Sequence, residues 1–365
     1  MNPIRVLVVD DSPTMRGLIS LALRRDPAIA VVATASNPLT ARDAIKEHNP
    51  DVITLDVEMP GMNGLDFLEK IVRLRPTPVI MVSNLTGAGT ETAIEAMHIG
   101  AVDCIAKPAP GDAQPFAELP RMVKAAAGAR VRPRATVVKA ESDAKAPREP
   151  QRRPFIASYE PDGRLLAIGS STGGVEALSE LISGLPENCP PTVIVQHMPP
   201  DFTASLAARL DRLNAPKVSE AQDGDPIEVG RIYIAPGGAR HLEVEDGHGL
   251  RCRLRAAPPV NGHSPSVDVL FTSVARTVKA NAVGVILTGM GRDGAQGLLA
   301  MREAGAATIG QDEATSLIYG MPRAAFEVGA VERQLPLDRI ANAVLVMTNL
   351  RGRQGREAKC HSQTS

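Results

Sequence analysis

The chain has 365 residues, of which 44% are hydrophobic and 22% charged, and its formal net charge is -1. A globular chain of this length usually divides into two domains. The balanced charge and an aromatic content of 2% give no basis for nucleic-acid binding, because such surfaces use basic and aromatic side chains. The apolar runs are too short to span a membrane and no secretory signal is present. We therefore expect a cytoplasmic protein that inserts into no membrane.

The first part of the chain, residues 1–124, alternates short apolar segments with amphipathic helical patterns. This alternation is typical of an α/β domain with a parallel sheet. Five strands are expected, with apolar segments at Val6–Val9, Ala30–Ala33, Val52–Leu55, Val79–Val82 and Cys104–Ile105.

Residues 125–160 are predicted to form a linker between two domains. From Gly128 to about Pro154 the sequence has no apolar period, and eight basic residues outnumber three acidic ones between Arg130 and Arg153. Such a composition cannot bury enough apolar surface to offset the entropy lost on ordering. A basic linker is usually only solvated, and contact with nucleic acid is the lesser alternative.

A second α/β unit is predicted for residues 161–350, followed by a polar tail at 351–365. Its apolar segments again have strand length and are separated by helical patterns. Two further segments, His241–Val244 and Arg251–Arg255, flank Asp246-Gly247 and predict a hairpin. The strands of the main sheet are expected at Leu165–Ile168, Thr192–Gln196, Ile232–Ala235, Ala282–Leu287 and Ala307–Ile309.

Polar residues follow the strands of the first domain. Asp10 and Asp11 close the first strand and Asp56 the third, and then come Ser83 after the fourth and Lys107 after the fifth. The carboxyl ends of parallel strands meet at one edge of a sheet, so these groups should converge there. Three neighbouring carboxylates repel one another unless a hard cation such as Mg²⁺ lies among them. One carboxylate could then accept a phosphoryl group, although helix capping alone is the alternative interpretation.

Three segments contain the polar residues of this domain: Val8-Val9-Asp10-Asp11-Ser12, the stretch from Leu55 to Gly64, and Ala106-Lys107-Pro108. These segments resemble the signature blocks of response-regulator receiver domains. In one position the chain departs from that family, because Cys104 stands three residues before Lys107, where an aromatic switch residue is usual.

This resemblance implies a flavodoxin-like (βα)5 fold for the first domain. It also implies that Asp56 is phosphorylated by a partner histidine kinase, with Ser83 and Lys107 supporting the phosphoryl group. The Mg²⁺ ligands that it implies are Asp10, Asp11 and Asp56.

A glycine-bracketed serine turn lies near the start of the second domain. The apolar segment that ends at Ile168 runs into Gly169-x-Ser171-x-Gly173, which fits the pattern of a nucleophile elbow. The glycines permit a tight turn, and the N–H after the serine would lie at a helix N-terminus, placed to stabilise an oxyanion. Alone, this pattern also fits phosphate binding or a simple turn.

A serine nucleophile needs a general base and a carboxylate that orients the base. His197 closes a strand, which places it at the same sheet edge as Ser171, although a histidine at a strand end is often only structural. Asp293 follows another strand in a glycine-rich loop and is the favoured carboxylate. Asp268 and Asp312 are its rivals, and helix capping would also explain Asp293.

Five further segments of the second domain form a set: Gly169–Gly174, Gln196–Pro200, Tyr233–Gly237, Pro265–Phe271 and Leu287–Gly294. They resemble the blocks of the CheB-type chemotaxis protein-glutamate methylesterases. The resemblance implies a doubly wound, mostly parallel α/β hydrolytic domain without a cofactor. Its implied reactions are hydrolysis of glutamyl methyl esters on methyl-accepting chemoreceptors and deamidation of receptor glutamines. It assigns Ser171, His197 and Asp293 to catalysis and the backbone N–H of Met290 to an oxyanion hole. The N–H of Thr172, directly after the serine, is the second candidate donor, and packing or capping is the alternative for Thr172.

The pairing of a receiver with this domain implies a regulated enzyme. The receiver is expected to lie over the catalytic edge, and phosphorylation of Asp56 is expected to favour an open arrangement. The alternative is a phosphorylation-dependent binding regulator whose second domain is catalytically silent. That domain has neither a helix-turn-helix pattern nor a basic face, which favours the enzyme.

Overall fold

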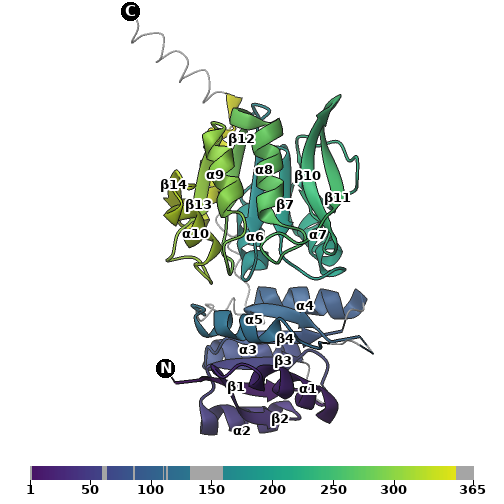
Figure 1. The fold of residues 1–365 in the computed structure, drawn as a ribbon, viewed down its shortest axis with the longest axis vertical. Coiled ribbons are helices and arrows are strands. Elements are labelled where there is room, and N and C mark those ends of the chain that lie inside the picture. The colour runs from purple at the N-terminus through teal and green to yellow at the C-terminus, as the bar shows by residue number, and fades with distance from the viewer. Residues whose placement is uncertain are drawn as a thin grey trace, which may run out of the picture.

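The computed structural model describes residues 2–59, 64–84, 87–109, 111, 114–131 and 159–350. These residues form two α/β units, coloured purple to blue and teal to yellow in Figure 1. Most of the predicted linker and the whole predicted tail lie outside the described residues. Within the described part, no helix is long and apolar enough to cross a membrane.

The N-terminal unit is a five-stranded parallel sheet with strand order β2-β1-β3-β4-β5. Its strands are β1 (Ile4–Val9), β2 (Ile29–Ala35), β3 (Val52–Asp56), β4 (Val79–Ser83) and β5 (Asp103–Ala106). Its helices are α1 (Pro13–Arg24), α2 (Pro38–His48), α3 (Gly64–Leu74), α4 (Gly87–Ile99) and α5 (Leu119–Ala127).

Local sequence explains where these elements begin and why they pack. The Ser12 hydroxyl accepts a hydrogen bond from the Met15 N–H and caps α1, and the Asn37 side chain caps α2 in the same way. A proline opens each of these two helices, where its missing N–H costs nothing. Strands β3 and β4 are buried along their whole length, as in a parallel sheet with both faces covered.

The C-terminal unit is a seven-stranded sheet with strand order β14-β13-β12-β6-β7-β9-β8, in which all neighbouring strands are parallel. Its strands are β6 (Leu165–Ser170), β7 (Thr192–Gln196), β8 (Lys217–Glu220), β9 (Arg231–Ile234), β12 (Ala282–Ile286), β13 (Ala307–Gln311) and β14 (Arg333–Leu335). Its helices are α6 (Gly174–Ser183), α7 (Phe202–Leu213), α8 (Val267–Thr277), η1 (Lys279–Asn281), α9 (Ala295–Glu303), α10 (Met321–Glu327) and α11 (Leu337–Met347). An antiparallel hairpin of β10 (Arg240–Gly247) and β11 (Gly249–Ala256) packs against α8.

Helices cover both faces of this sheet, which makes it doubly wound. Leu166 and Ile168 of β6 belong to the hydrophobic cluster that contains α6, α7 and α11. The alternating residues Leu165 and Ala167 belong to the cluster that contains α8, α9 and α10. Side chains alternate along a strand, so one apolar segment supplies both cores.

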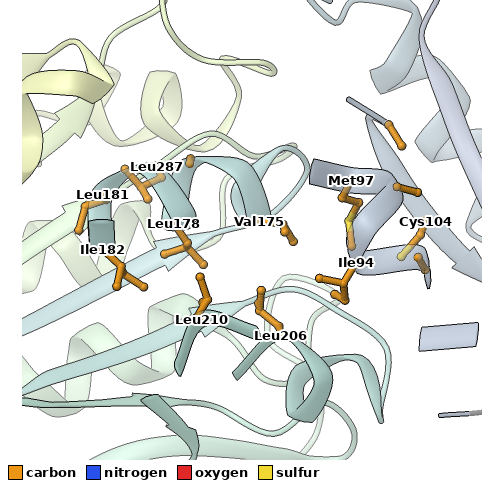
Figure 2. Packing of buried hydrophobic residues seen from close by; sticks show 14 of the residues in the cluster. Ile94, Met97, Cys104, Val175, Leu178, Leu181, Ile182, Leu206, Leu210 and Leu287 are labelled. Atoms are coloured by element: carbon orange, nitrogen blue, oxygen red, sulfur yellow. The ribbon is translucent and has the colours of Figure 1, made fainter. Parts of the chain in front are cut away.

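The two units share one hydrophobic cluster. Helix α4 of the N-terminal unit packs against α6 and α7 of the C-terminal unit. Figure 2 shows Ile94 and Met97 of α4 on one side of this cluster, with Val175 of α6 and Leu206 of α7 on the other. The N-terminal unit is therefore packed on the C-terminal unit through apolar side chains.

The structure contains every strand predicted from the sequence, with bounds that differ by a few residues. The predicted hairpin turn at Asp246-Gly247 is wrong, because β10 continues through these residues and the turn is at His248. Helix α5 runs to Ala127, beyond the predicted boundary at residue 124, because its buried apolar face continues through Ala126. The short strands β8 and β14 were not predicted. The domain boundaries themselves stay predictions.

Candidate active site and acidic site

A tight serine turn follows β6. The Ser170 hydroxyl donates to Gln196 Oε1 at 2.7 Å, which ties this turn to the end of β7. Gly173, with φ of 78°, precedes α6 in the left-handed conformation that glycine adopts without strain. A Cβ at Gly174 would lie 1.9 Å from Gln196 Oε1. The glycines are therefore required for the chain to turn sharply at Ser171.

Three neighbouring strands bring Ser171, His197 and Asp293 to one edge of the sheet. Strand β6 lies between β7 and β12, and each of the three residues comes after the carboxyl end of one of these strands. His197 Nε2 donates to Asp293 Oδ2 at 2.8 Å. His197 Nδ1 is buried and, among the described residues, has no hydrogen-bond partner. The described contacts include no bond between the Ser171 hydroxyl and His197, and such bonds often form only with substrate present.

Several donors besides His197 hold Asp293, whose side chain is buried. Burial by itself would raise the pKa of this carboxyl, but the hydrogen bond and charge of His197 and the neighbouring donors hold it well below its usual range. Asp293 is therefore an anion at neutral pH and can stabilise a protonated imidazole. The other donors are Ser266 Oγ at 2.8 Å, the Val267 N–H at 2.7 Å, the Asp268 N–H at 3.2 Å and Asn261 Nδ2 at 3.1 Å.

The carboxylates of the two rival aspartates bind other groups. Asp268 lies beside the site, but its carboxylate accepts from the Gly297 N–H at 2.6 Å and from Asn261 Nδ2 at 2.7 Å. The Asp312 carboxylate accepts from the N–H and the hydroxyl of Thr315, at 2.9 and 2.7 Å. The contact with the His197 imidazole distinguishes Asp293 from both.

Three side chains of this site were not predicted from the sequence: Asn261, Ser266 and His263. They come from the segment between the hairpin and α8, where no strand end marks them. The one available signal was Ser266, whose side chain caps α8. The His263 ring is stacked on the His197 ring, with centroids 3.8 Å apart and 4° between the planes.

The two predicted oxyanion donors lie close to the serine. In the described part of the chain, neither the Thr172 N–H nor the Met290 N–H is bonded to a backbone acceptor, as an oxyanion hole requires. Gly289 lets this loop approach the serine, because a Cβ there would lie 2.8 Å from Ser171 Cβ. The Thr172 hydroxyl donates to Asp103 Oδ2 at 2.6 Å. The N-terminal unit therefore touches the residue next to Ser171.

Asp10, Asp11 and Asp56 each offer a carboxylate oxygen within 4.8 Å of the others. Lys107 Nζ lies 2.9 Å from Asp56 Oδ1 and 3.9 Å from Asp10 Oδ2. Within the described residues, Asp10 Oδ2 and Asp56 Oδ2 are buried without a hydrogen-bond partner. Burial and the charge of Asp56 raise the pKa of Asp10 to about 6, and burial raises the pKa of Asp56. Hard oxygen donors with uncompensated charge fit a divalent cation such as Mg²⁺.

Two further residues singled out in the N-terminal unit, Ser83 and Cys104, make contacts outside the carboxylate cluster. The Ser83 hydroxyl donates to the Gly89 carbonyl oxygen at 2.9 Å, so its support of a phosphoryl group stays a prediction. Cys104 is buried in the cluster shared by the two units, near Met97 (Figure 2). Burial raises the pKa of its thiol well above the ordinary value, so the side chain is a neutral apolar group there.

Polar contacts join the two units at the edge where Ser171 lies. Burial raises the pKa of Asp103, while its hydrogen bond with Thr172 opposes that shift. This bond crosses the interface directly beside the serine turn. Further polar contacts between the units are Thr90 Oγ1 with Ser205 Oγ at 2.9 Å, the Arg130 N–H with the Leu317 carbonyl oxygen at 3.2 Å, and the Arg130 guanidinium with the Glu313 carboxylate at 2.6 Å.

Comparison with known proteins identifies the family. Residues 166–344 match the family model described as CheB methylesterase, and residues 6–114 match the response regulator receiver domain. Over 96% of its length, the chain is 59% identical to protein-glutamate methylesterase/protein-glutamine glutaminase 1 of Caulobacter vibrioides, and covers 100% of that protein. The chain belongs to the CheB methylesterase family.

Other members of the CheB methylesterase family are also similar to this chain. A protein-glutamate methylesterase/protein-glutamine glutaminase of Agrobacterium fabrum is 59% identical, over 95% of this chain and 97% of that protein. The crystal structure of the Thermotoga maritima CheB methylesterase catalytic domain matches with a TM-score of 0.50 and 38% identity, covering 51% of this chain and 98% of that domain. The family resemblance and the α/β fold predicted from the sequence are confirmed.

Proposed function

We propose that this protein hydrolyses glutamyl methyl esters on methyl-accepting chemoreceptors, releasing methanol, and deamidates particular receptor glutamines. Its whole-length relatives are named protein-glutamate methylesterase/protein-glutamine glutaminase. The observation that carries the proposal is the convergence of Ser171 with the bonded pair His197 and Asp293 at one sheet edge. The modified receptor helices are cytoplasmic, so the proposal places the enzyme in the cytoplasm.

The contacts of His197 assign its two nitrogens in the reaction. Nε2 is bonded to Asp293, so Nδ1 takes the proton as the Ser171 oxygen forms a bond to the ester carbonyl carbon. The N–H groups of Met290 and Thr172 stabilise the oxyanion of the tetrahedral intermediate. The bond to the methoxy group then breaks, and methanol leaves with the proton from His197. Water, deprotonated by His197, releases glutamate and restores the serine; with glutamine, ammonia is the leaving group.

Replacing the nucleophile tests this mechanism. Ser171→Ala should lower methanol release from methylated receptors by about 10³-fold or more, because the covalent step is lost. Ser179→Ala is the matched control, because among the described residues that hydroxyl bonds only the Val175 carbonyl oxygen within α6. A fluorophosphonate probe should label the wild type and Ser179→Ala but not Ser171→Ala. Wild-type methanol release by Ser171→Ala would contradict the mechanism, and an unlabelled, inactive wild type would support the binding-regulator alternative.

We infer further that a histidine kinase phosphorylates Asp56 and that this opens the enzyme. The cluster of Asp10, Asp11 and Asp56 would hold Mg²⁺, whose charge would offset that of the phosphoryl oxygens, and Lys107 adds a second positive charge. The N-terminal unit packs against the catalytic edge, which would obstruct a large helical substrate. Phosphorylation would favour arrangements in which α4 and β5 release that edge.

Methanol release measured with and without a small-molecule phosphodonor tests this regulation. The phosphodonor should raise the activity of the wild type but not that of Asp56→Asn, which lacks the acceptor carboxylate. Asp51→Asn is the matched control, since exposed Asp51 only accepts from the Arg5 N–H at the start of β1. This control should be activated like the wild type. Activation of Asp56→Asn would show that the phosphoryl group is accepted elsewhere.

A further inference from the structure

The His263 ring lies flat on the ring of the catalytic base. The centroids of His263 and His197 are 3.8 Å apart, and the planes differ by 4°. His263 thus covers one face of the His197 ring, while Asp293 binds its Nε2 edge. The Nδ1 edge is left for the proton from Ser171. The proposed roles of Ser171, His197 and Asp293 do not explain why a fourth side chain is stacked on His197.

A short turn fixes the position of the His263 ring. The turn 260–263 is closed by two backbone hydrogen bonds between its end residues, at 3.0 and 2.9 Å. Its central residues Asn261 and Gly262 have φ of 53° and 80°, and positive φ at both positions is the property of type I′ turns. Asn261 Nδ2 also donates to Asp293 Oδ1 at 3.1 Å. The turn that carries His263 is therefore tied to the carboxylate that orients the base.

His263 is uncharged at neutral pH. Burial and the neighbouring His197 lower the pKa of His263 to about 4; Arg121 of α5 also lowers it, and Asp293 opposes the shift. The base becomes a cation during the reaction, and a cation beside a neutral aromatic face is attracted to it. A charged ring in the same place would repel that cation.

We propose that His263 is a positioning residue that acts through His197. Its flat contact keeps the His197 ring in the plane in which Nε2 meets Asp293 and Nδ1 is free, and its π face stabilises the protonated ring. The inference rests on the ester hydrolysis proposed above, and it assigns His263 no contact with the substrate. The competing explanation is a half-buried histidine that only fills space at the end of an exposed turn.

Two substitutions separate these explanations. His263→Phe keeps a flat aromatic face without a ring nitrogen, whereas His263→Leu keeps apolar volume without that face. We expect kcat for methanol release to stay within about threefold of the wild type in His263→Phe and to fall about tenfold in His263→Leu, with KM within about twofold in both. His248→Ala, in the exposed turn of the hairpin, is the control and should match the wild type.

A spectroscopic measurement accompanies the kinetics. A stacked ring shifts the ring-proton NMR signals of His197, so this ring-current shift should be present in the wild type and in His263→Phe and absent in His263→Leu. Thermal unfolding of each variant shows whether it is folded. His263→Gln, which also lacks an aromatic face, replaces His263→Leu if that variant does not fold.

Each outcome decides one point. Equal kcat in His263→Leu and His263→Phe means that the ring only fills space and overturns the proposal. A His263→Phe variant as slow as His263→Leu means that a ring nitrogen is needed, which overturns it as well. A wild type that releases no methanol refutes the proposed function instead, and the ring-current shift then decides the stacking contact by itself.

Discussion

Buried aspartates lie at the strand ends of both parallel sheets, and their surroundings have opposite effects on them. Asp293 accepts hydrogen bonds on both carboxylate oxygens, and its pKa lies well below the usual range. Asp10 and Asp56 share Lys107, and each keeps a buried oxygen that has no partner among the described residues. The pKa of Asp10 is accordingly raised to about 6. The carboxylate of the candidate catalytic site is thus fully hydrogen-bonded by the protein itself, whereas the carboxylates of the acidic site need a cation.

The two aspartates therefore respond to pH in opposite ways. A carboxyl whose pKa is raised on folding stabilises the fold below its unfolded value of 3.8, and Asp10 loses that contribution as the pH rises through about 6. Asp293, whose pKa is lowered, stabilises the fold above 3.8 and loses that contribution only as the pH falls through its low folded value. At neutral pH the ionised Asp293 carboxylate stabilises the fold, whereas the ionised Asp10 carboxylate destabilises it.

The largest effect is expected at the candidate catalytic site. Asp293→Asn should lower kcat for methanol release by about 10³–10⁴-fold, because an amide neither stabilises the imidazolium nor fixes the proton on His197 Nε2. Asp268→Asn, which changes the neighbouring carboxylate, should cost less than about tenfold. Circular dichroism of both variants verifies the fold. If Asp293→Asn kept more than a tenth of the activity, the contact with His197 would not be catalytic.

A moderate effect is expected at the acidic site, where Mg²⁺ binding should depend on pH. Asp10 must lose its proton to bind a cation, so the affinity for Mg²⁺ should fall by about tenfold for each pH unit below 6 and be level at higher pH. Isothermal titration calorimetry between pH 5 and pH 8 measures this. Asp10→Asn should bind weakly throughout, and Asp51→Asn should behave as the wild type. An affinity that is the same at both ends of the range would rule out a raised pKa at Asp10.

The smallest effects are expected at the interface between the N-terminal and C-terminal units. Asp103→Ala removes the partly buried bond to Thr172, about 1 kcal/mol, and should raise methanol release without phosphodonor about fivefold. Glu313→Gln removes an ion pair whose side chains are 54% and 59% exposed. It should change methanol release without phosphodonor less than about twofold, because water and salt screen such pairs. A larger effect for Glu313→Gln would mean that the exposed pair, not the partly buried bond, holds the interface.

Strand-end residues were the part of both sites that could be predicted from sequence. Ser171, His197 and Asp293 come after neighbouring strands of one sheet. In the other sheet Asp10 follows β1, and Asp56 is the last residue of the neighbouring β3. The placement followed from a local pattern, because a buried apolar segment predicts a strand and the carboxyl ends of parallel strands gather at one edge. The hairpin turn at His248 was misplaced because a turn signal of two residues is weak beside pairing along the whole hairpin.

The sequence by itself determined two α/β domains, their family, and the residues at the two sheet edges. The tertiary structure decided which ring nitrogen of His197 meets Asp293, that Asn261 and His263 complete the site, and that Asp103 of one unit touches Thr172 of the other. These contacts join segments far apart in the chain, and no periodic pattern or spacing encodes them. Only the packing of the folded units brings such groups within hydrogen-bonding or stacking distance.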